Sequence, residues 1–328
     1  MVFSNFVTLI AGLCISAGIK SAVNKEVSSD GCRKAFPSGR QTGREYLIPY
    51  TDDQGHDRDY LLFIPPQYSK KNPNPVIFSY HGGNKTPEEQ RDLDLFETPE
   101  FNTDHIVVYL RGYQKRWEGV PNITKRNDIL YTQTVLNDLE STYCIDKSRI
   151  FMTGKSEGGG FANFAACHKG LSTRFAAFAP VSGSFYIENV ENCDPNTVEI
   201  PCTPGRPSTS IPIIEFHGGI DTIISYNGSS DRRGACLPNI FHWATSWALR
   251  DNLSGQAAET SITTRAKRYQ WGSGNQLGLV SHIFEQDVNH SWPYTGKNSD
   301  NKAHKDGPAS YNASQYIVDF FRKHRLPV

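Results

Sequence analysis

The feature that most constrains the fold is the G-x-S-x-G sequence of residues 154–158 together with its setting. A β-rich run leads into it, and a series of small residues follows it up to Ala166. Strand, sharp turn and helix in immediate succession are the context of a nucleophile elbow. Glycine is required on both sides because a Cβ there would collide with the neighbouring strand or helix. The pattern predicts Ser156 as a nucleophile at a helix N-terminus, where the positive helix end favours developing negative charge; the alternative is an ordinary glycine-rich turn.

Short apolar runs alternate with helical patterns over most of the chain. Strand-like runs cover residues 58–64, 76–80, 105–110, 149–153, 175–181, 211–216 and 279–285, and helical patterns cover 128–143, 157–167 and 313–323. Such alternation predicts a mostly parallel sheet with helices on both faces. With the elbow after the fourth strand, it indicates the α/β-hydrolase fold in one domain spanning residues 23–328. Residues 186–210, rich in Pro, Thr and Ser, are expected to form a surface excursion.

A nucleophilic serine in this fold needs an acid and then a histidine later in the chain. Asp221 closes the turn after the sixth strand, and His290 follows the last strand. These two are predicted as the orienting acid and the general base. The rival His217 lies on the turn that positions Asp221 and is expected to be a structural hydrogen-bonding residue, while His282 falls inside a strand. Asp287 could orient His290 locally, but it does not follow a strand of its own.

Acyl transfer also needs two hydrogen-bond donors for the oxygen that becomes negatively charged. The backbone N–H of Glu157, directly after the nucleophile, is predicted as one donor. The other is expected from the loop after an early strand, where residues 80–84 read YHGGN and resemble the HGG-type oxyanion loop of esterases. The N–H of Gly82 or Gly83 is assigned to this role, and a plain turn is the alternative.

The N-terminus has the composition of a processing segment. Residues 6–19, FVTLIAGLCISAGI, form an uncharged apolar run that is followed by small residues. This predicts a secretory signal peptide over residues 1–22, cut between Ala17 and Ala22, with a short membrane anchor as the alternative. The run is too short for a comfortable membrane span, and no other apolar run approaches ~20 residues. We therefore expect a secreted, extracellular protein that has no membrane association after cleavage.

Cysteine usage agrees with export. Cys14 leaves with the signal peptide, and the even number that remains suggests three disulfides among Cys32, Cys144, Cys167, Cys193, Cys202 and Cys236. A helix of ~11 residues and a strand of ~5 residues cover similar lengths, which would return Cys167 to the level of Cys144. Cys193 and Cys202 would close a short loop, and Cys32 and Cys236 would pair by elimination. Sequons at Asn84, Asn122, Asn227, Asn252, Asn289 and Asn312 also fit a secreted glycoprotein.

The charge balance narrows the classes of partner. Lys plus Arg and Asp plus Glu number 34 each, so the net charge is zero and no basic run is present. A nucleic-acid partner is therefore excluded. The cysteines show no C-x-x-C spacing, which disfavours a zinc or redox site, and we expect neither a metal nor another cofactor. The oligomeric state is left open by the sequence.

Taken together, four segments resemble the fungal feruloyl esterases of carbohydrate esterase family 1, a group related to secreted polyhydroxybutyrate depolymerases. They are SYHGGN at 79–84, YCIDKSRIFMTGKSEGGG at 143–160, IIEFHGGIDTIISYNG at 213–228 and NHSWPY at 289–294. The resemblance implies a cofactor-independent Ser-Asp-His esterase that acts on feruloylated plant cell-wall polysaccharide or oligosaccharide. It also implies that Trp292 lines the acyl pocket, with Trp117 as a further candidate for substrate binding.

Two departures from the family pattern concern the site. Lys155 precedes the nucleophile where many related esterases carry an apolar or aromatic residue, and Asn289 stands where glycine often precedes the histidine. The acyl preference therefore stays open, and an acetylxylan esterase or a polyhydroxybutyrate depolymerase is the alternative within enzymes. A non-catalytic secreted binding protein is the alternative of another class, and the intact Ser156, Asp221 and His290 argue against it.

Overall fold

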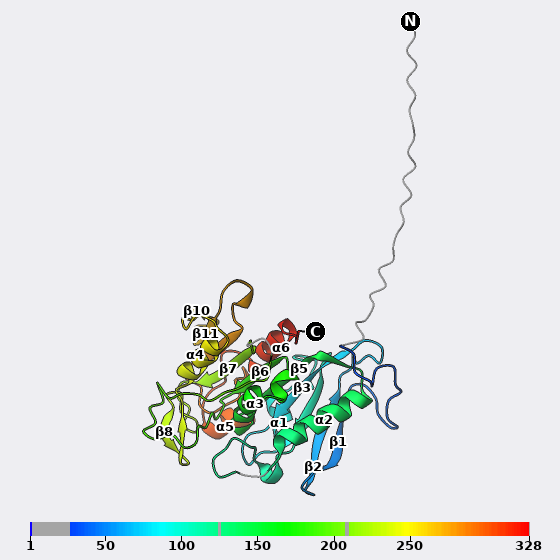
Figure 1. The fold of residues 1–328 in the computed structure, drawn as a ribbon, viewed down its shortest axis with the longest axis horizontal. Helices are drawn as coiled ribbons and strands as arrows, with labels where there is room; N and C mark the ends of the chain where they lie inside the picture. The colour runs from blue at the N-terminus through cyan, green and yellow to red at the C-terminus, as the bar shows by residue number, and fades with distance from the viewer. Residues whose placement is uncertain (2–26, 124–125, 207–209, 328) are drawn as a thin grey trace.

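A computed structural model of the chain describes residues 1, 27–123, 126–206 and 210–327. Apart from residue 1, the predicted signal peptide lies outside these described residues. A ten-stranded sheet runs through the molecule (Figure 1), in the order β1-β2-β4-β3-β5-β6-β7-β12-β11-β10. Its strands are β1 (Arg44–Thr51), β2 (Asp57–Ile64), β3 (Asn74–Tyr80), β4 (Ile106–Leu110), β5 (Ile145–Lys155), β6 (Ala177–Val181), β7 (Ile213–Gly218), β10 (Ala258–Ser261), β11 (Ala266–Trp271) and β12 (Val280–Glu285).

The middle of the sheet is parallel and its edges are antiparallel. Neighbouring strands from β4 through β3, β5, β6 and β7 to β12 run parallel, whereas β1 and β2 on one side and β10 and β11 on the other pair antiparallel. Every residue of β3 is buried, as expected for a strand covered on both faces. The predicted α/β-hydrolase architecture is confirmed, and the outer strands β1, β10 and β11 are additions that the sequence patterns did not predict.

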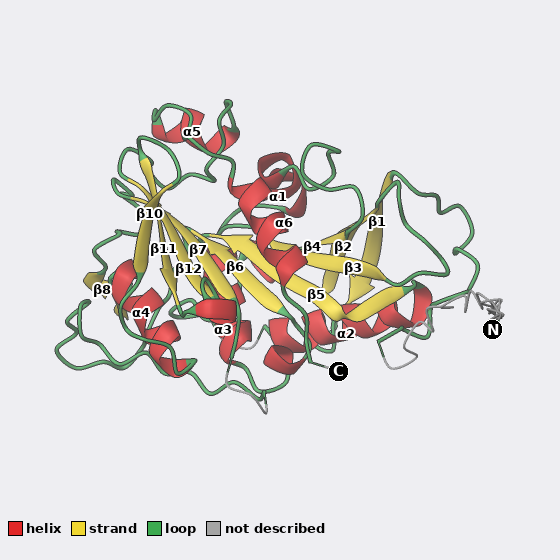
Figure 2. Cartoon of the chain, turned by 90° about the horizontal axis from the view of Figure 1, so that it is seen from above, coloured by secondary structure: helices red, strands yellow, loops and turns green. Residues whose placement is uncertain are grey.

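Helices cover both faces of the sheet (Figure 2). One face carries α2 (Asp128–Thr142), α3 (Glu157–Cys167) and α4 (Ile240–Arg250), and the other carries α1 (Pro87–Asp94) and α6 (Ala313–Lys323). Two clusters of buried side chains correspond to these layers, the first containing Val135 and Trp243 and the second Leu93 and Phe321. The short helix α5 (Ser299–His304) lies beyond the layers. Of the helices in the described residues, none has both the length and the apolarity needed to cross a membrane.

The three disulfides connect different cysteines from those predicted. The pairs are Cys32–Cys144, Cys167–Cys202 and Cys193–Cys236. The prediction took the strand before the elbow as five residues, but β5 has 11 residues and α3 also has 11. At ~3.3 Å per strand residue and ~1.5 Å per helix residue, the helix returns along less than half of the strand. Cys167 therefore ends well short of Cys144, which explains why the predicted pairing is wrong.

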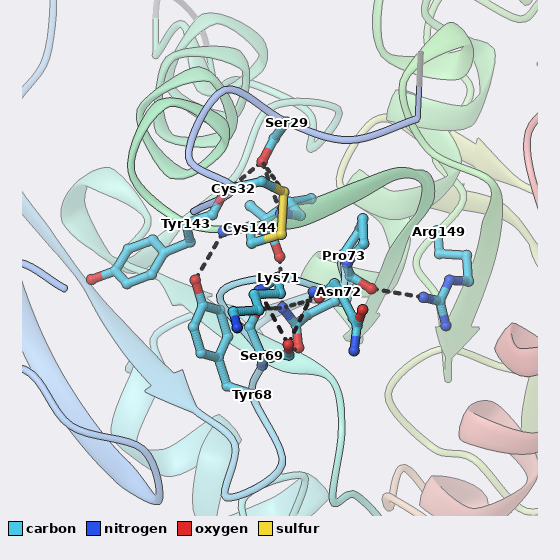
Figure 3. The surroundings of a disulfide bond; sticks show 12 residues. Ser29, Cys32, Tyr68, Ser69, Lys71, Asn72, Pro73, Tyr143, Cys144 and Arg149 are labelled. Atoms are coloured by element: carbon cyan, nitrogen blue, oxygen red, sulfur yellow. Dashed lines mark hydrogen bonds between the residues drawn. A yellow bond between two sulfur atoms is a disulfide. The ribbon is translucent and has the colours of Figure 1, made fainter. Parts of the chain in front are cut away.

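The Cys32–Cys144 disulfide ties the described N-terminal segment to the start of β5 (Figure 3). The Ser29 hydroxyl donates to the Tyr143 carbonyl at 2.6 Å, and the hydroxyl of Tyr68 accepts the N–H of Cys144 at 2.9 Å. The second predicted pairing fails for a different reason, because Cys193 bonds to Cys236 on a small hairpin instead of closing a local loop. That hairpin consists of β8 (Ser229–Arg232) and β9 (Ala235–Leu237) and stands outside the main sheet.

Candidate active site

The elbow has the backbone geometry that its sequence predicts. Ser156 lies between β5 and α3 with φ 56° and ψ −115°, a backbone conformation that residues other than glycine rarely adopt. Its N–H donates to the Val181 carbonyl at 2.9 Å, which fixes the turn against β6. A Cβ added to Gly154 would come within 2.6 Å of the Gly158 backbone, and one on Gly158 would collide with the backbone of Tyr80. The chain can therefore turn this sharply only because both positions are glycine.

The predicted oxyanion loop lies directly beside the elbow. A Cβ built on Gly82 would lie 3.5 Å from the Ser156 Cβ, and one on Gly83 would overlap the Glu157 carboxylate. His81 is buried, and its Nε2 accepts the N–H of Gly112 at 3.0 Å. Its Nδ1 lies 2.8 Å from the Gly82 carbonyl and must carry the proton that bonds it. Burial lowers the pKa of His81 to about 4, so the ring is neutral and holds this carbonyl in place.

The predicted acid and base form a direct hydrogen bond. His290 Nδ1 lies 2.7 Å from Asp221 Oδ2, and both residues are buried. The other oxygen of Asp221 accepts the N–H groups of Ile223 and Ile224 at 2.8 and 2.7 Å. The carboxylate is therefore oriented from both sides, and Nε2 of His290 is left as the basic nitrogen. Asp287 lies on the surface near Arg265 at 3.6 Å, away from this pair.

Burial and charge set the protonation of the pair. Burial and, after it, the nearby Lys155 ammonium lower the pKa of His290 to about 4 against the opposing effect of Asp221. Burial would raise the pKa of Asp221, but hydrogen bonds from His217 and His290 outweigh it and hold that pKa well below its ordinary range. At neutral pH the pair is therefore a neutral imidazole beside a carboxylate, which is the state a general base requires.

Behind Asp221 lies a buried polar network, of which the sequence predicted only His217 as a structural hydrogen-bonding residue. His217 Nδ1 lies 2.8 Å from Glu215 Oε1, and its Nε2 lies 2.8 Å from the Ile224 carbonyl and 3.3 Å from Asp221 Oδ2. Both ring nitrogens thus face acceptors. Burial disfavours the charged ring, but Glu215 and then Asp221 outweigh it and raise the pKa of His217 to about 10. His282, inside β12, lies 2.8 Å from the other Glu215 oxygen. Neither His217 nor His282 is among the described residues that line the cavity containing Ser156.

Two further contacts join the loops of the site, and neither has a signal in the sequence. Lys155 pairs with Asp300 of α5 at 3.1 Å, and Asp300 also accepts the N–H of Trp292 at 2.9 Å. Asn289 Oδ1 accepts the N–H of Thr222 at 3.0 Å, beside Asp221. The departures from the family pattern, Lys155 and Asn289, are therefore structural links between the elbow, the acid loop and the histidine loop.

Ser156 and His290 open into one cavity of about 450 Å³. It is lined by the predicted oxyanion residues and by apolar, charged and polar side chains, namely Gly82, Gly83, Asn84, Lys85, Glu89, Gln90, Leu93, Lys155, Ser156, Glu157, Ile223, Arg232, Arg233, His290, Ser299, Asp300, Ala303 and His304. That volume lies within the range of small-molecule sites. In the part of the chain that is described, no group of three or more His, Cys, Asp or Glu side chains is arranged to hold a metal ion.

Neither predicted tryptophan lines this cavity. Trp292 is 1% exposed, and its indole N–H donates to the Ser314 hydroxyl at 3.0 Å on the core side of α6. Trp117 is fully buried, donates to the His81 carbonyl at 2.8 Å and packs on Phe161. The expectation that these rings contact substrate is wrong in this geometry, because each ring completes the core and each indole N–H already has a partner.

Comparison with known proteins points to esterases. No family model matches the chain. Feruloyl esterase B of Piromyces equi is 24% identical over 233 residues, covering 68% of this chain and 41% of that protein. A bifunctional acetylxylan esterase/xylanase of Neocallimastix patriciarum is 25% identical over 249 residues, covering 74% of this chain and 32% of that protein. The chain thus spans less than half the length of either relative.

Solved structures agree on the fold. A mutant of the feruloyl esterase module from Clostridium thermocellum, complexed with sinapinate, superposes with a TM-score of 0.53 at 14% identity, covering 90% of this chain and 94% of that one. At this identity the likeness concerns the fold alone. The chain has the α/β-hydrolase fold and is a distant homologue of fungal feruloyl and acetylxylan esterases.

Proposed function

We propose that the protein is a secreted serine carboxylic-ester hydrolase with Ser156 as nucleophile, His290 as general base and Asp221 as orienting acid. The observation that carries the proposal is the single cavity into which the strained serine and the Asp221-bonded histidine both open. The three disulfides support an extracellular location, because such bonds persist in oxidising compartments. Distant homology to plant cell-wall esterases supports the ester as the bond that is cleaved.

In this mechanism the Ser156 hydroxyl attacks the ester carbonyl while Nε2 of His290 takes its proton. The carbonyl oxygen becomes an oxyanion, and the tetrahedral intermediate then expels the sugar alcohol, which receives the proton from His290. A water molecule attacks the acyl-enzyme by the same route and releases the carboxylic acid. Asp221 keeps the proton-bearing Nδ1 of His290 bonded throughout, so that Nε2 always faces the reacting atoms.

The oxyanion donors are proposed as the N–H groups of Glu157 and Gly83. Glu157 begins α3, whose positive end supports an anion. The choice of Gly83 over Gly82 follows from the carbonyl of Gly82, which bonds His81. Because the C=O and N–H of one trans peptide point in opposite directions, the N–H of Gly83 points away from His81.

For the acyl group we propose a hydroxycinnamate such as ferulate, released from a plant cell-wall polysaccharide. The cavity of about 450 Å³ has room for an aromatic acid, and Leu93, Ile223 and Ala303 contribute apolar surface to its lining. The second candidate is an acetylxylan esterase. It is favoured by the lining itself, since no Phe, Tyr or Trp is among the described residues of the cavity, and an acetyl group needs no aromatic wall.

The test compares substrates and one variant. The wild type should hydrolyse methyl ferulate and release ferulate from feruloylated arabinoxylan faster than it releases acetate from acetylated xylan. Ser156→Ala should lose turnover by a factor of ~10⁶, whereas Ser254→Ala, an exposed serine outside the cavity, should not. Faster release of acetate would favour the second candidate, and activity on a polyester film alone would favour a depolymerase. Failure of a fluorophosphonate to label Ser156 would leave a non-catalytic binding protein.

A further inference from the structure

Two arginines project from the β8–β9 hairpin into the lining of the cavity. Arg232 ends β8, and the turn that follows consists of Arg233 and Gly234, with φ values of 59° and 77°. Positive φ at both central residues of a two-residue hairpin turn is the conformation that Asn and Gly normally occupy. An arginine at that first position costs backbone energy. A contact of its side chain is therefore the expected reason for its presence there.

The hairpin is held rigidly beside the site. Cys236 of β9 is bonded to Cys193, and its backbone N–H and C=O both pair with Ile187 at 2.9 Å. At the tip, Asp231 Oδ1 accepts the N–H of Gly234 at 2.9 Å. The backbone that carries the arginines is therefore fixed by a disulfide and by hydrogen bonds, and little backbone entropy would be lost when they bind a ligand.

Among the described residues of the cavity lining, every lysine, arginine and carboxylate but one has an oppositely charged partner. Lys85 pairs with Glu89 at 3.0 Å and Lys155 with Asp300 at 3.1 Å. Glu157 is shared by two guanidinium groups, Arg116 at 2.7 Å and Arg233 at 3.0 Å.

Arg232 has no carboxylate partner among the residues that the structure describes, and its buried Nε meets no acceptor there. Asp231, its neighbour on β8, does not line this cavity. The described lining therefore carries four cationic side chains, Lys85, Lys155, Arg232 and Arg233, against the three carboxylates of Glu89, Glu157 and Asp300. One positive charge is in excess in the cavity that Ser156 also lines, and Arg232 is the side chain without a partner.

We propose that Arg232, with Arg233 beside it, binds a carboxylate of the substrate, and that the ester cleaved is carried by a polysaccharide containing uronic acid residues. The inference rests on the proposed function. Once esterified, neither a hydroxycinnamate nor an acetate retains a carboxylate, so the negative charge must come from the sugar part. Guanidinium groups bind carboxylates by paired, charge-assisted hydrogen bonds, which fits a uronate fixed at one position relative to the ester.

The experiment compares two arabinoxylo-oligosaccharides that differ only in a glucuronic acid branch, both esterified with ferulate or, if the enzyme prefers it, with acetate, alongside neutral 4-nitrophenyl acetate. In the wild type, kcat/KM should be about tenfold higher for the branched oligosaccharide than for the unbranched one. Arg232→Gln should remove most of that ratio and Arg232→Lys should retain part of it. Arg44→Gln, an exposed arginine on the opposite edge of the sheet, is the control for loss of one charge and should keep the ratio. Raising the salt concentration from 0.05 to 0.5 M should also reduce the ratio in the wild type, by screening, by about twofold or more.

The outcomes separate the two proposals. A wild type that hydrolyses both oligosaccharides at equal kcat/KM overturns the uronate inference and leaves the esterase proposal intact. The same conclusion follows if Arg232→Gln keeps both the wild-type ratio and the wild-type circular dichroism spectrum. A charge preference seen only when the carboxylate is on the acyl side, as with 4-nitrophenyl hydrogen succinate against 4-nitrophenyl acetate, likewise overturns it. No hydrolysis of any ester, including 4-nitrophenyl acetate, rejects the proposed function itself.

Discussion

Burial and the charge of Lys155 are together expected to set the lower pH limit of activity through His290. A base with a pKa of about 4 is neutral above that pH, so kcat/KM for a neutral ester should fall only below about pH 4. Lys155→Met removes the ammonium that helps to lower this pKa. It also leaves the Asp300 carboxylate unpaired, which favours the imidazolium form of His290 further. The variant should therefore lose activity at a higher pH than the wild type.

Coulomb's law gives the order of magnitude of the pKa shift. Lys155 and His290 line the same cavity. A unit charge at a separation of ~8 Å contributes about 2 kcal/mol through an effective dielectric constant of about 20. At 1.36 kcal/mol per pKa unit, this corresponds to about one to two units. The acid limb should move from about pH 4 in the wild type to between about pH 5 and 6 in Lys155→Met.

The assay is kcat/KM for 4-nitrophenyl acetate from pH 3.5 to 8, with the product quantified after quenching. Lys155→Arg keeps the charge and should keep the limb near that of the wild type. Lys85→Met is the matched control, because Lys85 lines the same cavity but is half exposed and paired with Glu89. An acid limb near pH 6.5 in the wild type would refute the argument, as would an equal limb in Lys155→Met and wild type. Lys155→Met also leaves the buried Asp300 carboxylate without its partner. The free energy of unfolding of this variant in urea should therefore be lower than that of the wild type by about 3 kcal/mol.

Three further predictions follow from the fold. Trp292→Ala should lower the free energy of unfolding in urea by about 3–5 kcal/mol, and it should leave the preference between methyl ferulate and an acetyl ester unchanged, because the ring lies in the core and outside the cavity. His217→Gln should lower kcat more than it changes KM, since the ring braces Asp221 and makes no contact with the cavity; a change in KM alone would count against this role. The folded-state pKa of His290 lies below its ordinary value of 6.5, so this residue binds more protons in the unfolded chain between about pH 6.5 and 4, and its contribution to stability should fall as the pH is lowered through that window. Urea melts of the wild type and of His290→Gln isolate this contribution, and a wild type that gains stability relative to the variant as the pH is lowered would contradict the burial argument.

Local patterns predicted the parts of the fold that depend on neighbouring residues. The elbow is one of these, because strand, glycine-flanked serine and helix are consecutive in the chain. The parallel strands are another, because burial on both faces makes them continuous apolar runs. Strand β10 shows the limit of this approach: its four residues are all exposed, so it carries no apolar alternation that a sequence pattern could detect.

Contacts between distant residues could not be predicted. Nothing in the residues around Lys155 indicates Asp300 as its partner, and the disulfide pairing failed because the length of β5 was underestimated. Trp292 illustrates a third limit. Its position two residues after His290 suggested a place in the cavity, but the chain directs the imidazole into the cavity and the indole toward α6. Sequence proximity to a site residue does not determine which way a side chain points.

The stapled β8–β9 hairpin has a consequence for protein engineering. Its two strands pair with each other and not with the ten-stranded sheet, and the Cys193–Cys236 bond anchors it from outside. The residues at its tip can therefore be replaced without changing the pairing of the strands in the main sheet. Replacing Arg233-Gly234 with Asn-Gly would relax the turn while removing one charge from the cavity. Glu157 would keep Arg116 as its partner, so libraries confined to these few positions are a route to altered substrate choice.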